Sequence, residues 1–279
     1  MNFTDPNIGI IGYGKVGSAL GVSWSRAGIE VWALDKDILK LKQKIDNRPI
    51  GICSSAEELL DLCSVIFLCL REEDLSAQVD TLEKLNAHNI ILAHTAGSLS
   101  TDIFSSLKTS CQTAVFHPYR SFTGLTTEPG ILENSFIGIV ADSKIFPVLA
   151  ELVKKLKATP VKLDASNLPL YHASATILAG GTVCLIDSAE KFLKEAGFPE
   201  QYIPELVTSF VLQIIENIEK QGTQEALSGP WKRRAIQVIQ KHIDVINEKF
   251  PQKINLYLSL AQQVMDTEDE DFTDIFDIP

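Results

Sequence analysis

The sequence of 279 residues lacks the features that define several large classes of protein. It has no unbroken apolar run near the roughly 20 residues that a membrane-spanning helix needs, and its first residues lack the basic-then-apolar pattern of a signal peptide. Cations are scarce: 25 Lys and Arg against 36 Asp and Glu give a net charge of −11. Nucleic acids and anionic membranes require clustered cations, so we expect neither as a partner.

The cysteines form no C-x-x-C pair, and five of them cannot all be paired within one chain. This pattern disfavours structural disulfides and a zinc site and is typical of the reducing cytoplasm. Most cysteines lie in apolar runs, so we interpret each as a small buried hydrophobic residue rather than a nucleophile. We therefore expect a cytoplasmic protein without a bound metal. The cysteines are Cys53, Cys63, Cys69, Cys111 and Cys184.

The first half of the sequence alternates short apolar runs with longer amphipathic stretches. Continuous apolar runs are typical of parallel strands covered on both faces, and strict alternation of strand and helix indicates a doubly wound α/β sheet. We therefore predict a mostly parallel Rossmann domain. The predicted strands are 8–11, 30–34, 65–70, 90–93, 113–116 and 136–140, and the predicted helices are 16–27, 38–44, 56–62, 75–85 and 145–156.

From about residue 164 onward, long helical patterns replace the strands. Gly197, Gly222 and Pro251 separate these patterns, as residues that end helices do. We predict a dinucleotide-binding domain at 1–163 and a helical domain at 164–265 that binds substrate, forms a homodimer, or both. The predicted helices are 170–196, 199–221, 231–247 and 254–265.

The last residues, 266–279, carry seven carboxylates and no Lys or Arg. Such a run repels itself and is usually a solvated, flexible tail. Phe272 and Phe276 lie four residues apart and could instead dock on a partner or on the protein's own surface. From the sequence we favour a passive tail over a docking segment.

The strongest motif is a glycine pattern, G-x-G-x-x-G, that directly follows the first predicted strand and opens the first predicted helix. In a dinucleotide-binding turn the first glycine allows the tight bend, the second admits a pyrophosphate, and the third lets helix and strand pack closely. The helix N-terminus then holds the pyrophosphate. A glycine turn that merely connects strand and helix is the competing interpretation. The residues of the motif are Gly12, Tyr13, Gly14, Lys15, Val16 and Gly17.

Asp35 ends the second predicted strand, eighteen residues after Gly17. An acidic residue near this position accepts hydrogen bonds from the adenosine ribose and repels a 2′-phosphate. We therefore favour NAD as the cofactor, with NADP as an alternative because Lys36 follows directly. A solvated loop carboxylate is the competing interpretation of Asp35.

Ligands of open α/β sheets bind outside the carboxyl ends of the strands. Cys69 and Leu70 follow one strand and Thr95 follows the next, so we expect them beside the nicotinamide half of the cofactor. His117 lies at a further strand end, and an imidazole that titrates near neutrality can relay the proton that accompanies hydride transfer. A histidine that caps the strand is the alternative, and for His94 we favour the structural role.

His172, Thr176 and Gly180 lie on one face of the first C-terminal helix, at spacings of four residues. They could face a substrate, or the helix could pack at a dimer contact. Further along, a Gly-Pro turn at 229–230 precedes Lys232, Arg233 and Arg234 at the start of a helix. Cations oppose the dipole there, so they could meet an anion or form a solvated basic turn.

At these motifs the sequence resembles a poorly characterised family of Rossmann-like NAD(P) oxidoreductases with a C-terminal helical domain of unknown function. That family is related to pyrroline-5-carboxylate reductases, prephenate dehydrogenases and 6-phosphogluconate dehydrogenase-like proteins. The resemblance implies a catalytic role for His117. We expect the substrate to lie between His117 and the helix that bears Tyr171 and His172, and we take these three as the candidate catalytic residues. The matching stretches are G-Y-G-K-V-G-S-A-L (12–20), H-T-A-G-S-L (94–99), F-H-P-Y-R-S-F (116–122), Y-H-A-S-A (171–175) and L-S-G-P (227–230).

Two positions depart from the family pattern. Gly180 stands where the family helix usually has Asn, and Lys232-Arg233-Arg234-Ala235 replaces an Arg-Gly-Asp stretch. Two hypotheses follow. In the favoured one the chain is an oxidoreductase that acts on a small, anionic carbonyl, imine or hydroxy acid. In the other it is a dinucleotide-binding sensor or scaffold without catalysis, which acts through its helical domain or acidic tail.

Overall fold

The computed structural model describes residues 6–45, 47–123 and 128–264. Contacts divide the chain into two compact units, Met1–Gly180 and Gly181–Pro279. The boundary predicted between residues 163 and 164 lies where the last strand is followed by helices. The division by contacts comes later in the chain, so the helix at 168–176 belongs to the first unit. The predicted acidic tail, residues 266–279, lies outside the described residues.

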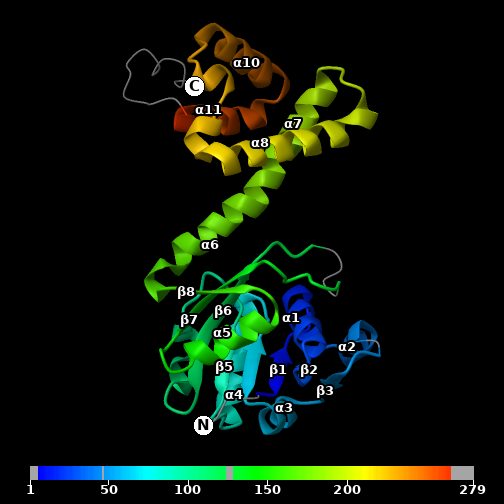
Figure 1. Ribbon diagram of the computed structural model, residues 1–279, viewed down its shortest axis with the longest axis vertical. Helices are drawn as coiled ribbons and strands as arrows, with labels where there is room; N and C mark the ends of the chain where they lie inside the picture. Colours follow the sequence, from blue (N-terminus) through cyan, green and yellow to red (C-terminus); the bar gives the residue numbers. More distant parts are fainter. Residues whose placement is uncertain (1–5, 46, 124–127, 265–279) are drawn as a thin grey trace. The chain divides into compact units, whose positions relative to one another are not determined.

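A mostly parallel sheet forms the centre of the first unit, as the alternation of strands and helices predicts (Figure 1). Its described part has eight strands in the order β3-β2-β1-β4-β5-β6-β7-β8, which is the Rossmann order with two strands added. β7 is antiparallel to β6, and the other neighbours are parallel. The strands are β1 (Ile8–Ile11), β2 (Val31–Leu34), β3 (Ile50–Ile52), β4 (Val65–Leu68), β5 (Ile91–His94), β6 (Gln112–Tyr119), β7 (Phe136–Ala141) and β8 (Thr159–Lys162).

Helices cover both faces of this sheet (Figure 1). In β4, Val65 and Phe67 belong to the core under α1, α2 and α5, whereas Ile66 and Leu68 belong to the core under α3 and α4. Successive side chains point to opposite faces, so a strand covered on both sides forms one unbroken apolar run. The helices are α1 (Lys15–Arg26), α2 (Ile38–Ile45), α3 (Ala56–Leu62), α4 (Glu72–Lys84) and α5 (Phe146–Lys155), with a 3-10 helix η1 (Thr101–Leu107).

Three aromatic side chains join the elements that carry the site. The rings of Trp24 on α1 and Phe116 on β6 lie 4.7 Å and 4.9 Å, centroid to centroid, from Phe67 on β4, and all three are fully buried. Each such pair contributes about 0.5–1.5 kcal/mol beyond the burial of its area. The Trp24 indole also donates a hydrogen bond to the carbonyl oxygen of Leu152 in α5, at 3.0 Å. This cluster fixes α1 and β6 relative to each other.

The second unit is helical throughout its described residues. Its buried core is made by Ile239, Ile243 and Ile246, which recur at helical spacing on α10, and by Ile254 and Leu258 on α11. The helices are α7 (Thr182–Glu195), α8 (Ile203–Ala226), α9 (Gly229–Lys232), α10 (Ile236–Lys249) and α11 (Ile254–Val264), with 3-10 helices η4 (Glu200–Tyr202) and η5 (Pro251–Lys253).

One long helix precedes and enters the second unit. It consists of α6 (Leu168–Thr176), the π-helix η3 (Ile177–Gly181) and α7, after a short 3-10 turn η2 (Ala165–Asn167). By length and composition the stretch 165–195 could cross a membrane, and the described residues do not bury its most apolar part. A search for unbroken apolar runs misses it because polar residues interrupt the pattern. Composition alone does not separate a membrane span from a helix whose apolar side is covered by protein.

The predicted elements and the structure differ in several places. The strands β3 and β8 have no counterpart among the predicted strand ranges, because runs of three and four residues are too short for a recognisable pattern. The predicted helix 231–247 is broken into α9 and α10 at Arg234, which has a positive φ of 52°. The predicted helix 199–221 begins at Ile203 and continues to Ala226 across Gly222, whose φ of 81° is not helical.

Candidate active site

The turn between β1 and α1 is built on two glycines that no larger residue could replace. Gly12 has a φ of +91°, and a Cβ there would lie 2.7 Å from the carbonyl oxygen of Cys69 in the neighbouring loop. A Cβ on Gly17 would collide with the carbonyl oxygen of Gly12. The first and third glycines of the motif therefore allow the sharp bend and the close packing of helix on strand, as the pattern predicts.

Gly14 differs from these two glycines because its surroundings are open. A Cβ on Gly14 would meet no atom within 4 Å, and both Gly14 and Lys15 are exposed. Gly14 is the N-cap of α1, and no side chain among the described residues caps the helix there. The free space, the uncapped amides and the positive end of the helix dipole fit the pyrophosphate of a dinucleotide.

Asp35 ties this turn to the end of β2. One oxygen of its carboxylate accepts a hydrogen bond from the backbone amide of Tyr13 at 2.7 Å, and the other accepts from the amide of Asp37 at 3.1 Å. Each oxygen keeps a lone pair that can accept from a ribose hydroxyl. The Asp35 carboxylate is therefore held beside the glycine turn at the end of β2, and the exposed Lys36 follows it.

Tyr13 and Val16 of the motif point inward. The Tyr13 side chain is fully buried against Gly21 of α1, and Val16 packs on the same core. Burial raises the pKa of Tyr13 to about 12. The backbone of Tyr13 is also engaged, because Lys44 donates to its carbonyl oxygen at 2.7 Å. Tyr13 and Val16 therefore pack the turn against the core, whereas Gly14 and Lys15 face solvent.

Cys69, Leu70 and Thr95 form the next part of the carboxyl edge of the sheet. The Cys69 side chain lies against Gly17, and that of Leu70 against Gly12. Burial raises the pKa of the Cys69 thiol to about 12, and a hydrogen bond with Thr95 opposes this shift. The thiol is therefore protonated at neutral pH and poorly suited to act as a nucleophile.

The interpretation of the cysteines as buried residues is wrong at one position. Cys184 on α7 is exposed, whereas Cys53, Cys63 and Cys111 are buried and Cys69 is partly buried. The apolar sequence around Cys184 suggested a core position, but none of the residues that the structure describes covers that part of α7.

His94 has a structural role in the described residues. It is fully buried at the end of β5, its Nε2 lies 3.1 Å from the carbonyl oxygen of Ser100, and its ring packs 5.6 Å from that of Phe104. Burial lowers the pKa of His94, so the ring is neutral at physiological pH.

His117 lies beside the loop that follows β5, because Gly97 in this loop has no side chain. A Cβ on Gly97 would lie 2.7 Å from Nε2 of His117 and 2.8 Å from the ring of His172. The rings of His117 and His172 are 5.8 Å apart, centroid to centroid. The structure thus brings together two histidines that are far apart in the sequence, one on β6 and one on α6.

Tyr171 contacts both the imidazole and the backbone of His117. Its hydroxyl oxygen lies 3.1 Å from Nδ1 of His117 and 3.4 Å from the carbonyl oxygen of the same residue. The hydroxyl occupies the space that a side chain at Gly138 would fill, since a Cβ there would lie 2.7 Å from it. Gly138 pairs with His117 across β6 and β7. Sequence reasoning missed Gly138, because a single glycine within a strand gives little signal. Gly97 belongs to the H-T-A-G-S-L stretch, but that pattern did not predict its contact with His117 and His172.

A further tyrosine fixes α6 to the sheet. The hydroxyl of Tyr119, at the end of β6, forms a 2.9 Å hydrogen bond with Ser174 on α6, and its ring lies 5.2 Å from that of Tyr171. The sequence motif around His117 contains Tyr119, but its pattern gave no reason to assign this contact.

The charge states of this cluster differ from the sequence expectation. Burial, followed by the nearby His172 and His94, lowers the pKa of His117 to about 4. Burial and Tyr119 raise the pKa of Tyr171 to about 12. The imidazole of His117 therefore does not titrate near neutrality in the free protein. At pH 7 it is neutral, and Tyr171 keeps its proton.

His117 and His172 open onto a pocket of about 380 Å³ within the first unit. Arg120 is the cation among its lining residues, and Thr176 lines it as well, as expected from its position one turn after His172. Tyr171 and Gly180 do not line this pocket. Its lining residues are His117, Tyr119, Arg120, Ser121, His172, Ala175, Thr176, Leu178 and Ala179.

Two family models match the sequence. Residues 7–97, which contain the glycine turn and Asp35, match the model described as NADP oxidoreductase, coenzyme F420-dependent. Residues 135–264, which contain Tyr171 and His172, match the domain of unknown function DUF2520. His117 lies between the matched ranges. The predicted resemblance is confirmed.

Solved structures share this fold over nearly the whole chain. A Bacteroides fragilis protein provisionally named an NADP oxidoreductase has a TM-score of 0.73 and 16% identity, covering 94% of this chain and 99% of its own. A Thermotoga maritima protein has a TM-score of 0.69 and 19% identity, covering 92% and 96%. The pyrroline-5-carboxylate reductase of Coxiella burnetii has a TM-score of 0.64 and 12% identity, covering 95% and 100%. No curated protein sequence matches this chain.

The lowered pKa of His117 makes stability depend on pH. Between about pH 6.5 and pH 4 the unfolded chain binds a proton at His117 that the folded chain does not bind, so stability falls as the pH falls through this window. His117→Gln removes the titrating group. We expect the melting temperature of the wild type to fall further between these two pH values than that of the variant. Parallel falls in both proteins would contradict the shift.

Proposed function

We propose that this protein is an NAD(P)-dependent oxidoreductase that transfers a hydride to or from a small anionic carbonyl, imine or hydroxy acid. One observation carries the proposal. An unbroken series of contacts runs along the carboxyl edge of the sheet, from Gly17 and Cys69 through Thr95 to the loop of Gly97 and on to His117. A cofactor on the glycine turn would therefore have its reactive end directed along the same edge as the histidine pocket.

The first unit supplies the cofactor site. Gly14, Lys15 and the start of α1 would hold the pyrophosphate, Asp35 the adenosine ribose, and Cys69, Leu70 and Thr95 the nicotinamide half. A bound nicotinamide supplies or accepts the hydride. We favour NAD over NADP because the carboxylate of Asp35 repels a 2′-phosphate. The NADP family model and the neighbouring Lys36 support the alternative.

The pocket favours a small anion. Its volume of about 380 Å³ suits a small molecule. Arg120 and His172 would attract a carboxylate, and no acidic residue is among the described lining residues. Overall acidity of the chain does not oppose this, because local charges decide binding at contact distance.

His117 would move the proton at Nε2. In the oxidative direction a neutral His117 accepts the proton of the substrate hydroxyl or amine, while Nδ1–H donates to Tyr171 and Tyr171 donates to the His117 carbonyl. In the reductive direction the imidazolium returns this proton to the substrate oxygen or nitrogen. A bound anion raises the pKa of His117 by favouring its charged form. Tyr171 would act as a positioning residue that fixes the ring.

The second candidate is a dinucleotide-binding sensor without catalysis. The low pKa of His117 in the free protein favours it, as does Gly180 in place of the family's asparagine. A protein that binds a dinucleotide but reduces no substrate would match this candidate.

Hydride transfer tests the proposal directly. We would follow NADH and NADPH oxidation with small cyclic imines and 2-oxo acids, and NAD and NADP reduction with the corresponding amines and hydroxy acids. We expect turnover with at least one anionic substrate, and a loss of about 10²–10⁴-fold in kcat for His117→Ala with unchanged cofactor affinity. Tyr171→Phe should lower kcat less and shift its pH profile.

Two results would count against catalysis at this site. Equal turnover by His117→Ala would remove His117 from the mechanism. Cofactor binding without turnover of any member of the panel would favour the sensor.

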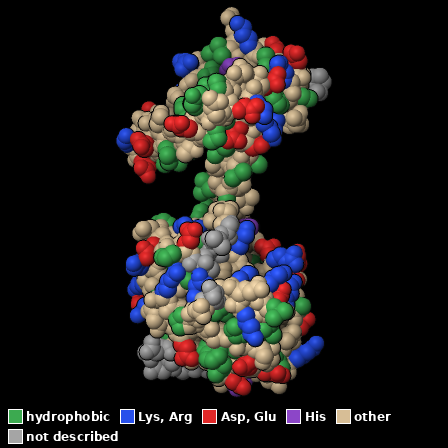
Figure 2. All heavy atoms as spheres, turned by 90° about the vertical axis from the view of Figure 1, so that its right-hand side faces the viewer, with side chains coloured by type: hydrophobic (Ala, Val, Ile, Leu, Met, Phe, Trp, Pro, Cys, Tyr) green, Lys and Arg blue, Asp and Glu red, His purple; other side chains and the backbone are tan. Residues whose placement is uncertain are grey.

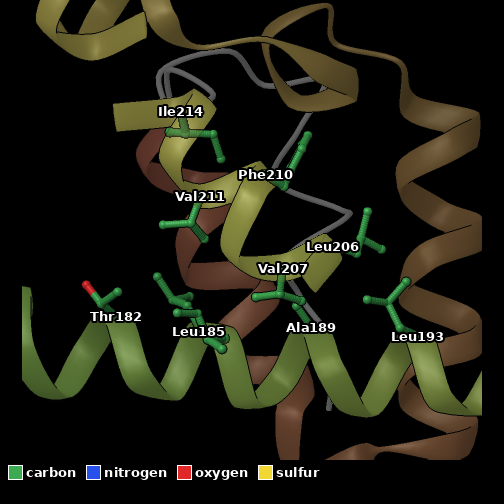
Figure 3. A pocket seen from close by; sticks show the side chains of 10 residues that line it. Thr182, Leu185, Ala189, Leu193, Leu206, Val207, Phe210, Val211 and Ile214 are labelled. Atoms are coloured by element: carbon green, nitrogen blue, oxygen red, sulfur yellow. The ribbon is translucent and has the colours of Figure 1, made fainter. Parts of the chain in front are cut away.

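We also propose that the helical unit forms a homodimer. A groove of about 600 Å³ between α7 and α8 is lined almost wholly by apolar side chains such as Leu185, Val207 and Phe210. In Figure 3, the side chains of Leu185 on α7 and Val207 on α8 lie between the two helices. Phe210, Ile214 and Ile218 form an exposed stripe at spacings of four residues. Exposed apolar patches of this kind mark protein interfaces.

Charged residues flank the apolar ones on this unit, as Figure 2 shows. Asp187, Glu190 and Lys191 lie within α7, which a protein interface tolerates at its rim and a lipid bilayer does not. A second copy of the chain is therefore the favoured partner, in the cytoplasm, where the five free cysteines would stay reduced.

Sedimentation velocity checks the dimer. We expect the wild type to sediment at twice the chain mass of 30.7 kDa. Phe210→Asp should shift the protein to monomer, because an unpaired charge in an apolar contact costs several kcal/mol. Thr208→Asp places the same charge on an exposed site of α8 outside the groove and should leave the mass unchanged. A monomeric wild type, or one that partitions into membranes, would contradict the dimer.

A further inference from the structure

The second unit contains a second pocket that the proposed function does not use. It has a volume of about 560 Å³ and lies among α7, α10 and α11. Its lining is mainly apolar: Phe192 packs on Phe250 with ring centroids 5.1 Å apart, Ile246 is buried, and Val245 is 51% exposed. An open apolar pocket of this size needs an occupant.

The charged residues that line this pocket are Lys241, Lys249 and Glu195. Lys249 pairs with Glu195 at 2.5 Å, whereas Lys241 has no ion pair within the described residues. Tyr257 also lines the pocket, and its hydroxyl accepts a hydrogen bond from the Trp231 indole at 3.0 Å. Two further cations, Lys232 and Arg233, directly follow Trp231 in the sequence. The pocket therefore favours an apolar group with negative charge around it.

Residues 265–279 have this chemistry. They carry seven carboxylates and no Lys or Arg, with Phe272 and Phe276 among them. They also start close to the pocket in the chain, because they follow α11, which contributes Tyr257 to the lining. The helix from Tyr257 to Val264 is about 10 Å long at 1.5 Å per residue. The eight residues from Val264 to Phe272 can extend about 26 Å, so Phe272 can reach back.

We propose that residues 265–279 bind to the protein's own second unit, with Phe272 and Phe276 in this pocket and their neighbouring carboxylates facing Lys241 and the basic stretch after Trp231. This replaces the passive tail that the sequence favours. Attachment to α11 gives the segment a high effective concentration at the pocket, so a modest affinity keeps it bound.

Limited proteolysis of the full chain tests this binding. A glutamate-specific protease cuts after Glu268 and Glu270, and cleavage in a docked segment follows the fraction that is released. Replacing both phenylalanines, Phe272→Ser and Phe276→Ser, should speed this cleavage by about tenfold or more, because burying a single phenylalanine contributes roughly a factor of ten in binding. Val245→Asp should have the same effect from the pocket side.

Matched controls separate docking from general damage. Thr267→Ser and Thr273→Ser alter the same segment without removing an aromatic ring and should leave the rate unchanged. Val238→Asp places the same charge on an exposed site of α10 outside the pocket and should also leave it unchanged. Circular dichroism and melting of each variant check that the fold is intact, and the segment variants alter no residue of the described fold.

Three results would overturn the proposal. Rapid cleavage of the wild type, at the rate of the double phenylalanine variant, would show a free segment. Protection that disappears on dilution would place the segment on a second copy of the chain. An apolar carboxylate retained by the purified wild type in native mass spectrometry, with the segment cleaved freely, would make the pocket a small-molecule site.

Discussion

The close approach of α1 to β1 and β4 is the constraint on which the fold and the site depend. A single methyl group at Gly17 would strike the carbonyl oxygen of Gly12, and one at Gly12 would strike that of Cys69. Because these backbones touch, the amino end of α1 lies at the carboxyl edge of the sheet with its first amides uncapped. The free space and the uncapped amides on which the proposed anion site depends are thus a consequence of packing. The aromatic core between α1, β4 and β6 holds the strand of His117 in a fixed position relative to the glycine turn.

Glycines also permit close packing at the pocket of His117 and His172. Gly97 leaves room for the ring of His117, and Gly138 leaves room for the hydroxyl of Tyr171. The resulting burial has an electrostatic cost, which lowers the pKa of His117 to about 4. A neutral, fixed imidazole in a pocket with a cation is ready to accept a proton, and a bound anion would restore its capacity to hold one. Gly97 and Gly138 therefore link the packing of this region to the pKa of His117, because they allow the burial that lowers it.

The parts of the site that the sequence predicted are local in the chain. The glycine turn needs only one strand, one bend and one helix, and Asp35 follows within the same unit of structure, so pattern and spacing identify them. The contact of His117 with Tyr171 joins residues 54 positions apart, and no spacing rule reaches that far. The pKa of His117 depends on burial by several elements, so its neutral state could not be anticipated. The exposure of Cys184 on α7 could not be predicted either. An apolar sequence predicts that a helix is covered, but it does not show whether the same chain or a partner covers it.

Thermal melting with NAD, NADH, NADP and NADPH, in the wild type and in Gly14→Ala, tests the central claim most directly. A Cβ on Gly14 meets no atom within 4 Å, so the variant alone should melt close to the wild type. A dinucleotide at 100 times its dissociation constant should stabilise the wild type by about 2.7 kcal/mol, more with NAD(H) than with NADP(H), and the added methyl group should remove most of that shift by blocking the pyrophosphate. No shift of the wild type with any of the four, or equal shifts in both proteins, would contradict a dinucleotide site on the glycine turn.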